Sequence, residues 1–119
     1  MPRIKKYYIA IDFDGTLCTH KFPEIGVIRT EVVERIAKKV ELMNSLNRDV
    51  KVILWTCRED TPERAYLTEA LKWWTENGYD KKFFPIDYVN ENPDVTFGHP
   101  ELVRKIFANE YWDDRAVEV

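Results

Sequence analysis

Apolar positions in this chain follow two kinds of pattern, which alternate along the sequence. Short and almost uninterrupted apolar runs occupy residues 7–11, 50–56 and 84–89, and a further short segment, 109–112, ends in two aromatic residues. Runs of this length, rich in β-branched and aromatic residues, are typical of buried strands. Between them, residues 31–46 and the segment that ends at Gly78 carry apolar side chains at helical spacing against a charged face. The pattern therefore predicts strands that alternate with helices.

Residue types at the helix boundaries sharpen this prediction. Thr30 stands directly before the first helical segment and is a suitable N-cap. Thr61-Pro62-Glu63 combines a capping residue, a proline for the first helical position and an acidic residue for the first turn. We expect the second helix to begin there and to end at Gly78, a natural residue just beyond a helix C-terminus.

The order of the elements predicts the fold. Residues 17–29 and 90–100 indicate loops, and residues 101–106 a short helical turn. Alternating strands and helices need crossover connections, which favour a parallel sheet with helices on both faces. We expect one α/β domain over residues 1–119, a Rossmann-like three-layer domain with a mostly parallel sheet. A chain of 119 residues is long enough to bury about two thirds of its unfolded surface.

Composition changes this picture mainly by exclusion. Hydrophobic residues make up 45% of the chain and charged residues 33%, and the net charge is −3 without a block of like charges. This balance does not indicate a nucleic-acid binder, although a nucleic-acid substrate is not excluded. No apolar run approaches membrane-spanning length, and the N-terminus does not resemble a signal peptide. With only Cys18 and Cys57 as cysteines, we expect a cytoplasmic protein with free thiols.

Polar residues with the chemistry of an active site lie where the predicted strands end. Asp12 and Asp14 follow the first strand and are separated by one residue, so an extended backbone directs both carboxylates to the same side. Gly15 then permits a sharp turn. Two carboxylates this close repel each other unless a cation or a proton lies between them. The pair therefore indicates a divalent-cation site, with an Asx-type turn as the simpler alternative.

Two other predicted strands also end in polar residues. Thr56 ends the second strand, and Asp113 and Asp114 follow the last one. Each has an ordinary structural alternative, because β-branched residues are common in strands and acidic residues at solvated strand ends. Since the carboxyl ends of parallel strands meet at one edge of the sheet, the agreement of three strands favours a shared site.

In this order, the residues resemble the motifs of the haloacid dehalogenase (HAD) superfamily of phosphatases. Residues 12–17, Asp-Phe-Asp-Gly-Thr-Leu, are similar to its first motif almost letter for letter, and Thr56 is similar to the second. Lys105, eight residues before Asp113, is similar to the combined third and fourth motifs of small members. The resemblance spans nearly the whole chain, and its first motif is specific. The segments between the motifs have no room for a cap domain, so the chain resembles a capless member.

The resemblance implies a Mg²⁺-dependent phosphatase that acts through an aspartyl-phosphate intermediate. Asp12 would attack the phosphorus atom, and Asp14 would protonate the leaving oxygen and then activate water. Mg²⁺ would bind the Asp12 carboxylate, the backbone carbonyl of Asp14, and Asp113 or Asp114, of which Asp113 is favoured as the direct ligand.

The resemblance also implies the groups that bind the phosphoryl group. Thr56 would donate a hydrogen bond to it, Lys105 would neutralise its charge, and backbone N–H groups around Gly15 would add donors. Arg58 and Arg115 either bind a second phosphate or pair with Glu59 or Asp114, so we expect neither to belong to the catalytic set.

The substrate is a phosphorylated compound whose class the sequence leaves open. Two alternative functions use the same residues: phosphoryl transfer to an acceptor other than water, and a non-catalytic module that binds phosphate or metal. A CheY-like receiver domain is disfavoured, because its phosphoacceptor belongs at the end of a middle strand, where this chain has Thr56. Residues 17–29 have the length of a partial flap with Gly26 as its hinge. A weakly protected last strand makes a homo-oligomer an expectation.

Overall fold

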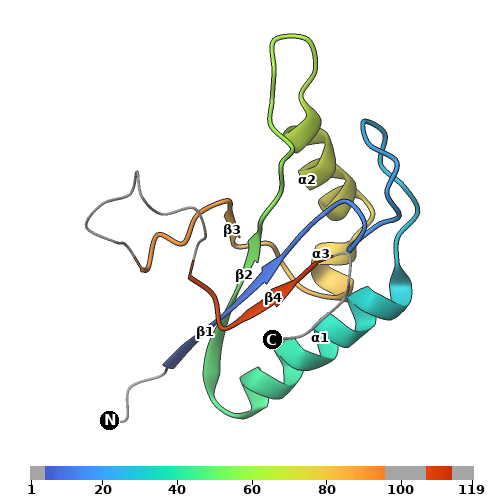
Figure 1. Ribbon diagram of the computed structural model, residues 1–119. Helices are drawn as coiled ribbons and strands as arrows, with labels where there is room; N and C mark the ends of the chain where they lie inside the picture. Colours follow the sequence, from blue (N-terminus) through green and yellow to red (C-terminus); the bar gives the residue numbers. More distant parts are fainter. Residues whose placement is uncertain (1–4, 96–106, 114–119) are drawn as a thin grey trace.

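The computed structural model describes residues 5–95 and 107–113, which form an α/β domain (Figure 1). The strands β1 (Lys5–Ile11), β2 (Arg48–Leu54), β3 (Tyr88–Val89) and β4 (Glu110–Trp112) pair in parallel, in the order β3-β2-β1-β4. The helices are α1 (Thr30–Ser45), α2 (Tyr66–Glu76) and α3 (Tyr79–Lys82). The predicted Rossmann-like α/β fold with a parallel sheet is confirmed. None of the helices in the described ranges is long and apolar enough to cross a membrane.

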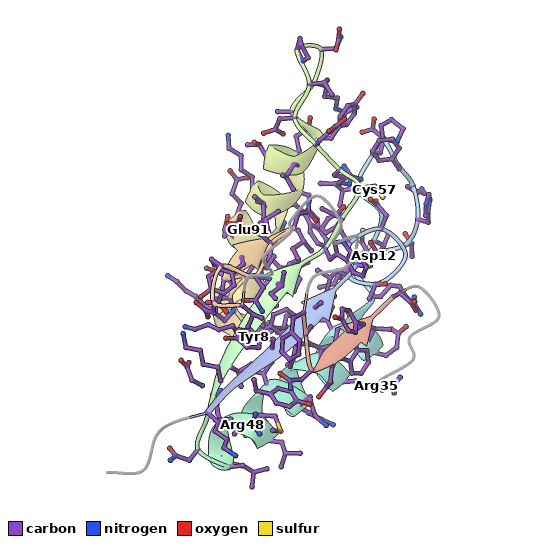
Figure 2. The ribbon with its side chains drawn as sticks, turned by 60° about the vertical axis from the view of Figure 1, so that its left-hand side comes forward. Tyr8, Asp12, Arg35, Arg48, Cys57 and Glu91 are labelled. Carbon is purple, nitrogen blue, oxygen red and sulfur yellow. The ribbon has the colours of Figure 1, made fainter. Side chains whose placement is uncertain are left out.

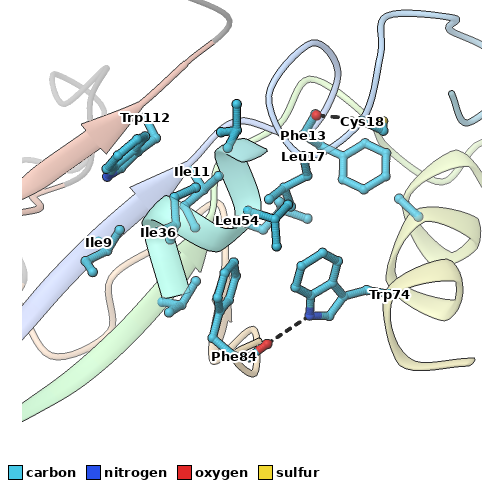
Figure 3. Packing of buried hydrophobic residues seen from close by; sticks show 14 residues of the cluster. Ile9, Ile11, Phe13, Leu17, Cys18, Ile36, Leu54, Trp74, Phe84 and Trp112 are labelled. Atoms are coloured by element: carbon cyan, nitrogen blue, oxygen red, sulfur yellow. Dashed lines mark hydrogen bonds between the residues drawn. The ribbon is translucent and has the colours of Figure 1, made fainter. Parts of the chain in front are cut away.

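Both long helices cover one face of the sheet, which we call the helical face. The chain moves in one direction from β1 through β2 to β3, so right-handed crossovers place α1 and α2 on the same side. Side chains from β1, β2, both helices and the segment after α3 form one apolar cluster (Figure 3), which includes Ile9, Ile11, Val52, Leu54, Val33, Ile36, Ala70, Trp74 and Phe84. This cluster is the main core of the domain.

The opposite face of the sheet carries a second, smaller cluster. Tyr8, Ala10 and Ile53 alternate with the residues of the helical face and pack against Ala108 and Val95. These last two belong to the described ends of the connection between β3 and β4, which therefore lie on this face. The described part of the third layer is therefore loop, and the helical turn predicted at 101–106 lies outside the described residues.

The helix ends differ from the predicted ones for local reasons. Thr30 is the first residue of α1 and Arg29 its N-cap, without a side-chain capping bond. The predicted start of α2 at Thr61 is wrong, because the Thr61 hydroxyl accepts the Arg64 N–H at 3.1 Å and closes a separate turn. The N-cap of α2 is Ala65, and the Asp60 carboxylate accepts the Thr68 N–H in the first turn of the helix at 2.9 Å. The end of α2 is confirmed, and Gly78 follows it with φ 75°.

The third strand is much shorter than the predicted segment 84–89. Phe84 turns into the helical-face cluster, where its carbonyl accepts the Trp74 indole N–H at 3.0 Å (Figure 3). Asp87 exchanges two hydrogen bonds with Val52, because its carboxylate accepts the Val52 N–H and its own N–H donates to the Val52 carbonyl, both at 2.8 Å. The apolar run at 84–89 therefore packs in the core at its start, and only its last two residues form a strand.

Candidate functional site

Three of the residues predicted for the site converge at the carboxyl edge of the sheet. Asp12, Thr56 and Asp113 line one cavity of about 310 Å³, together with Trp55, Cys57, Tyr111 and Trp112. Backbone hydrogen bonds of 2.8 Å from Asp12 to Trp112 and from Trp55 to Ile11 continue the sheet up to this point. The cavity lies where the strand order reverses around β1, the usual ligand position in open α/β sheets. We call it the β4-side cavity.

A second cavity opens on the other side of Asp12. It measures about 350 Å³ and is lined by Asp12, Asp14, His20, Phe22, Thr56, Cys57 and Arg58. We call it the loop-side cavity, because His20 and Phe22 belong to the loop that follows β1. Asp12, Thr56 and Cys57 line both cavities, and Figure 2 shows Asp12 and Cys57 at the upper end of the strands. These residues therefore form the centre of the candidate site.

The turn after β1 fixes the direction of the two aspartates. Phe13 and Leu17 are fully buried in the helical-face cluster (Figure 3) and anchor the turn. The Phe13 carbonyl accepts the Leu17 N–H at 3.0 Å, and Gly15 adopts φ 88°, a conformation that favours glycine. With its neighbour Phe13 anchored in the core, the Asp14 carboxylate lies in the loop-side cavity.

Arg58 is the main feature of this cavity that the sequence did not predict. Its side chain is fully buried, and its Nε and Nη2 donate to the two carboxylate oxygens of Asp14, each at 2.9 Å. The remaining donors reach the backbone carbonyls of Glu24 at 3.0 Å, Pro23 at 3.3 Å and Tyr66 at 3.5 Å. A guanidinium group has five N–H donors, so every one is used. A second phosphate would have to displace these bonds. The carboxylate partner of Arg58 is Asp14, not the neighbouring Glu59 that the sequence suggested.

The loop after β1 forms a short hairpin over the loop-side cavity. Thr19 donates its backbone N–H to the Val27 carbonyl at 2.8 Å, and the Val27 N–H returns to the Thr19 hydroxyl at 2.9 Å. Gly26 fits here because an added Cβ would lie 2.1 Å from the Thr19 carbonyl oxygen. Its absent side chain therefore permits the close approach of the two arms of the hairpin, and the role of Gly26 as a hinge stays a prediction.

The two cysteines lie in different surroundings, and both are free thiols. Cys18 is fully buried in the helical-face cluster, and this burial raises the pKa of its thiol. Cys57 is exposed and lines both cavities. Cys18 is thus a small apolar residue of the core, whereas the Cys57 side chain is accessible at the site.

The residues at the centre of the site suit a magnesium ion in the type of their donors. Asp12 and Asp113, which carry carboxylates, both line the β4-side cavity, and the Asp14 carbonyl follows two residues after Asp12. Mg²⁺ commonly binds one or two protein carboxylates and keeps several waters. Among residues 5–95 and 107–113, no group of three His, Cys, Asp or Glu side chains comes together. Lys105 and Asp114 lie outside the described residues.

Comparison with known proteins identifies a similar structure but no family. The chain resembles the solved structure of a conserved protein from Bacteroides thetaiotaomicron, with a TM-score of 0.58 and 28% sequence identity. The match covers 95% of this chain and 79% of the other. No protein-family model and no curated protein matches the chain. The likeness supports the α/β fold.

Proposed function

We propose that this protein is a Mg²⁺-dependent phosphohydrolase of the HAD type, which forms an aspartyl-phosphate on Asp12. The observation that carries the proposal is the convergence of Asp12, Thr56 and Asp113 around one cavity, with Asp14 in the adjoining one. These residues come from the ends of three different strands, and their order along the chain matches the order of the motifs. We further propose that the protein acts in the cytoplasm, where free thiols stay reduced.

In this proposal, Asp12 is the nucleophile and Thr56 binds the phosphoryl group. The Thr56 hydroxyl oxygen accepts the Arg58 backbone N–H at 3.1 Å, which leaves the hydroxyl proton available for a phosphoryl oxygen. The Thr56 backbone is itself held, because its N–H donates to the Asn90 side chain at 2.8 Å. Lys105 is proposed as a further cationic group for the phosphate.

Asp14 is proposed as the group that moves the proton. It would protonate the leaving oxygen and later accept a proton from the attacking water. Both of its oxygens accept hydrogen bonds from Arg58, but a carboxylate oxygen has a second lone pair for a proton or a substrate hydroxyl. The loop-side cavity, which Asp14 lines, is then the place of the leaving group.

Asp12 and Asp113, with the Asp14 carbonyl, would hold the magnesium ion. Bound Mg²⁺ would offset the repulsion between the anionic phosphate and the carboxylates. Asp113 would thereby orient Asp12 toward the cavity that they share.

A phosphatase screen with and without Mg²⁺ tests the proposal. We expect the wild type to release phosphate from at least one monoester, and Asp12→Asn to lose at least about a thousandfold of this activity, because covalent catalysis needs the carboxylate. Asp49→Asn is the matched control, since Asp49 pairs with Lys51 on β2, away from the site; it should keep wild-type turnover. Equal turnover by the wild type and Asp12→Asn would contradict the proposal. A complete lack of turnover would favour the phosphate- or metal-binding module.

The role of Asp14 is tested by trapping the intermediate. Asp14→Asn keeps the shape of the side chain but cannot accept a proton from water, so the phosphate should accumulate on Asp12. Intact-protein mass spectrometry would detect the added phosphate. Residual turnover of this variant without a trapped phosphoenzyme would count against Asp14 as the base.

A further inference from the structure

Arg58 joins three parts of the molecule that are far apart in the sequence. Its guanidinium group holds Asp14 in the turn after β1, the carbonyls of Pro23 and Glu24 in the hairpin loop, and the carbonyl of Tyr66 at the start of α2. With 2% of its surface exposed, Arg58 is buried. An arginine with all five donors used in a buried position is strongly constrained in its orientation.

Two aromatic rings also pack against the same group. The guanidinium carbon lies 5.1 Å from the centre of the Phe13 ring and 5.0 Å from the centre of the Phe22 ring. Phe13 is a core residue, whereas Phe22 is 49% exposed and lines the loop-side cavity. Phe22 also contacts the ring of Tyr66, with a centroid distance of 5.3 Å. The position of this exposed aromatic ring over the site therefore depends on Arg58.

We propose that Arg58 is a positioning residue that couples the hairpin loop, residues 19–27, to the orientation of the Asp14 carboxylate. The Nε and Nη2 groups of Arg58 orient the Asp14 carboxylate toward the leaving group. Other N–H groups of the same guanidinium bind the carbonyls of Pro23 and Glu24 and hold the loop over the loop-side cavity. Loss of either contact releases the other, because the five hydrogen bonds share one rigid plane. The catalytic part of this inference rests on the proposed function, whereas the coupling itself does not.

Arg64 offers a matched control for this contact with the loop. Its guanidinium group also holds the loop, through the Glu24 carboxylate at 3.0 and 3.4 Å, but it makes no contact with Asp14. Its other partner is Glu69 in α2. Arg64→Gln therefore loosens the loop from outside and leaves the fork between Arg58 and Asp14 in place.

Hydrogen–deuterium exchange of the protein without substrate tests the coupling independently of activity. We expect amides in residues 19–27 to exchange at least about tenfold faster in Arg58→Gln than in the wild type, and Arg58→Lys to restore only part of the protection. Because coupling is reciprocal, Asp14→Asn should also speed exchange in the loop, since Arg58 holds both Asp14 and the loop carbonyls. Unchanged loop exchange in Asp14→Asn would overturn the inference, and this variant decides the question even where Arg58→Gln does not fold.

The kcat/KM values for two phosphate esters then distinguish a specific effect on Asp14 from a general loosening of the site. The probes are p-nitrophenyl phosphate, whose leaving group needs little protonation, and an alkyl phosphate, whose leaving group needs it strongly. We expect Arg58→Gln to lower kcat/KM for the alkyl ester about 10–100-fold and for the aryl ester much less. Arg64→Gln should affect both esters equally and by less than about threefold.

The outcomes distinguish the two proposals. Equal losses on both esters in Arg58→Gln, or an Arg64→Gln loss as large as that of Arg58→Gln, would overturn the positioning role while the phosphatase proposal stands. An Asp12→Asn variant as active as the wild type would overturn the phosphatase proposal, and the exchange experiment would still decide the coupling.

Discussion

The two faces of the sheet are held by different forces. On the helical face, α1 and α2 bury a continuous apolar cluster in which most side chains are fully inaccessible. On the second face, four buried residues form a small cluster, and the loop after β3 is held by Asp94, which accepts hydrogen bonds from Lys6, Tyr8 and Tyr88 at 3.1, 3.2 and 3.0 Å. Apolar burial is not directional, whereas hydrogen bonds to a carboxylate depend on geometry and pH. The faces should therefore respond differently to mutation.

The largest effect is expected on the helical face. Trp74→Ala should lower the free energy of unfolding by about 3–5 kcal/mol, because Trp74 is 1% exposed and also donates to the Phe84 carbonyl. Urea denaturation would measure the loss, with Lys72→Ala, exposed on the same helix, as the control. A loss below about 1 kcal/mol would show that this face is not dominated by packing.

A second prediction concerns the polar exception on the helical face. Glu110 is 1% exposed, and its carboxylate accepts a hydrogen bond from the Tyr7 hydroxyl. It also accepts the Trp112 indole N–H at 3.1 Å and forms an ion pair with Lys39 at 3.3 Å. Glu110→Ala should cost about 2–3 kcal/mol, since it leaves these donors without their acceptor. Glu110→Gln should cost less, because an amide oxygen still accepts. Thermal or urea unfolding that ranks the two variants in the opposite order would refute this account.

On the second face, the expected effect is smaller and depends on pH. The hydrogen bond from Lys6 holds the pKa of Asp94 below its usual value. A lowered pKa in the folded state gives a stabilisation that is present above the unfolded value of about 3.9 and is lost as pH falls through the folded value. Asp94→Asn should therefore be less stable than the wild type at pH 7, and the difference should shrink below about pH 4. A difference that is constant down to pH 2 would exclude this origin.

The smallest predicted effect has the opposite sign. The Thr16 hydroxyl is buried and has no hydrogen-bond partner among the described residues. Thr16→Val keeps the shape and removes the unpaired group, so it should leave the stability unchanged or raise it by up to about 1 kcal/mol. A clear loss of stability would mean that this hydroxyl has a partner, and calorimetry can resolve the difference.

The sequence predicts an element correctly where local contacts determine its bounds, and it fails where long-range contacts determine them. The strand at 7–11, the helix at 31–46 and the end of α2 at Gly78 follow from local patterns, and the structure agrees within one or two residues. The predicted start of α2 at Thr61 is wrong because the Thr61 hydroxyl accepts the Arg64 N–H and closes a separate turn. The third strand was overestimated because Phe84 packs instead of pairing.

The same distinction applies to the candidate site. Asp12, Thr56 and Asp113 could be placed together because parallel strands share a carboxyl edge. Arg58 could not be paired with Asp14, because the two are 44 residues apart and their contact depends on how the hairpin loop folds back. Its one sequence signal was an arginine two residues after the second strand-end residue, Thr56.

The shortness of β3 has a consequence for how the protein behaves at high concentration. β3 is an outer strand of the sheet, and unpaired outer strands are the usual templates on which other chains add and aggregate. β3 has only two residues in ladder geometry, and beside it the Asp87 carboxylate accepts the Val52 N–H. A carboxylate thus occupies the position at which an added strand would have to continue the short ladder of β3 along β2.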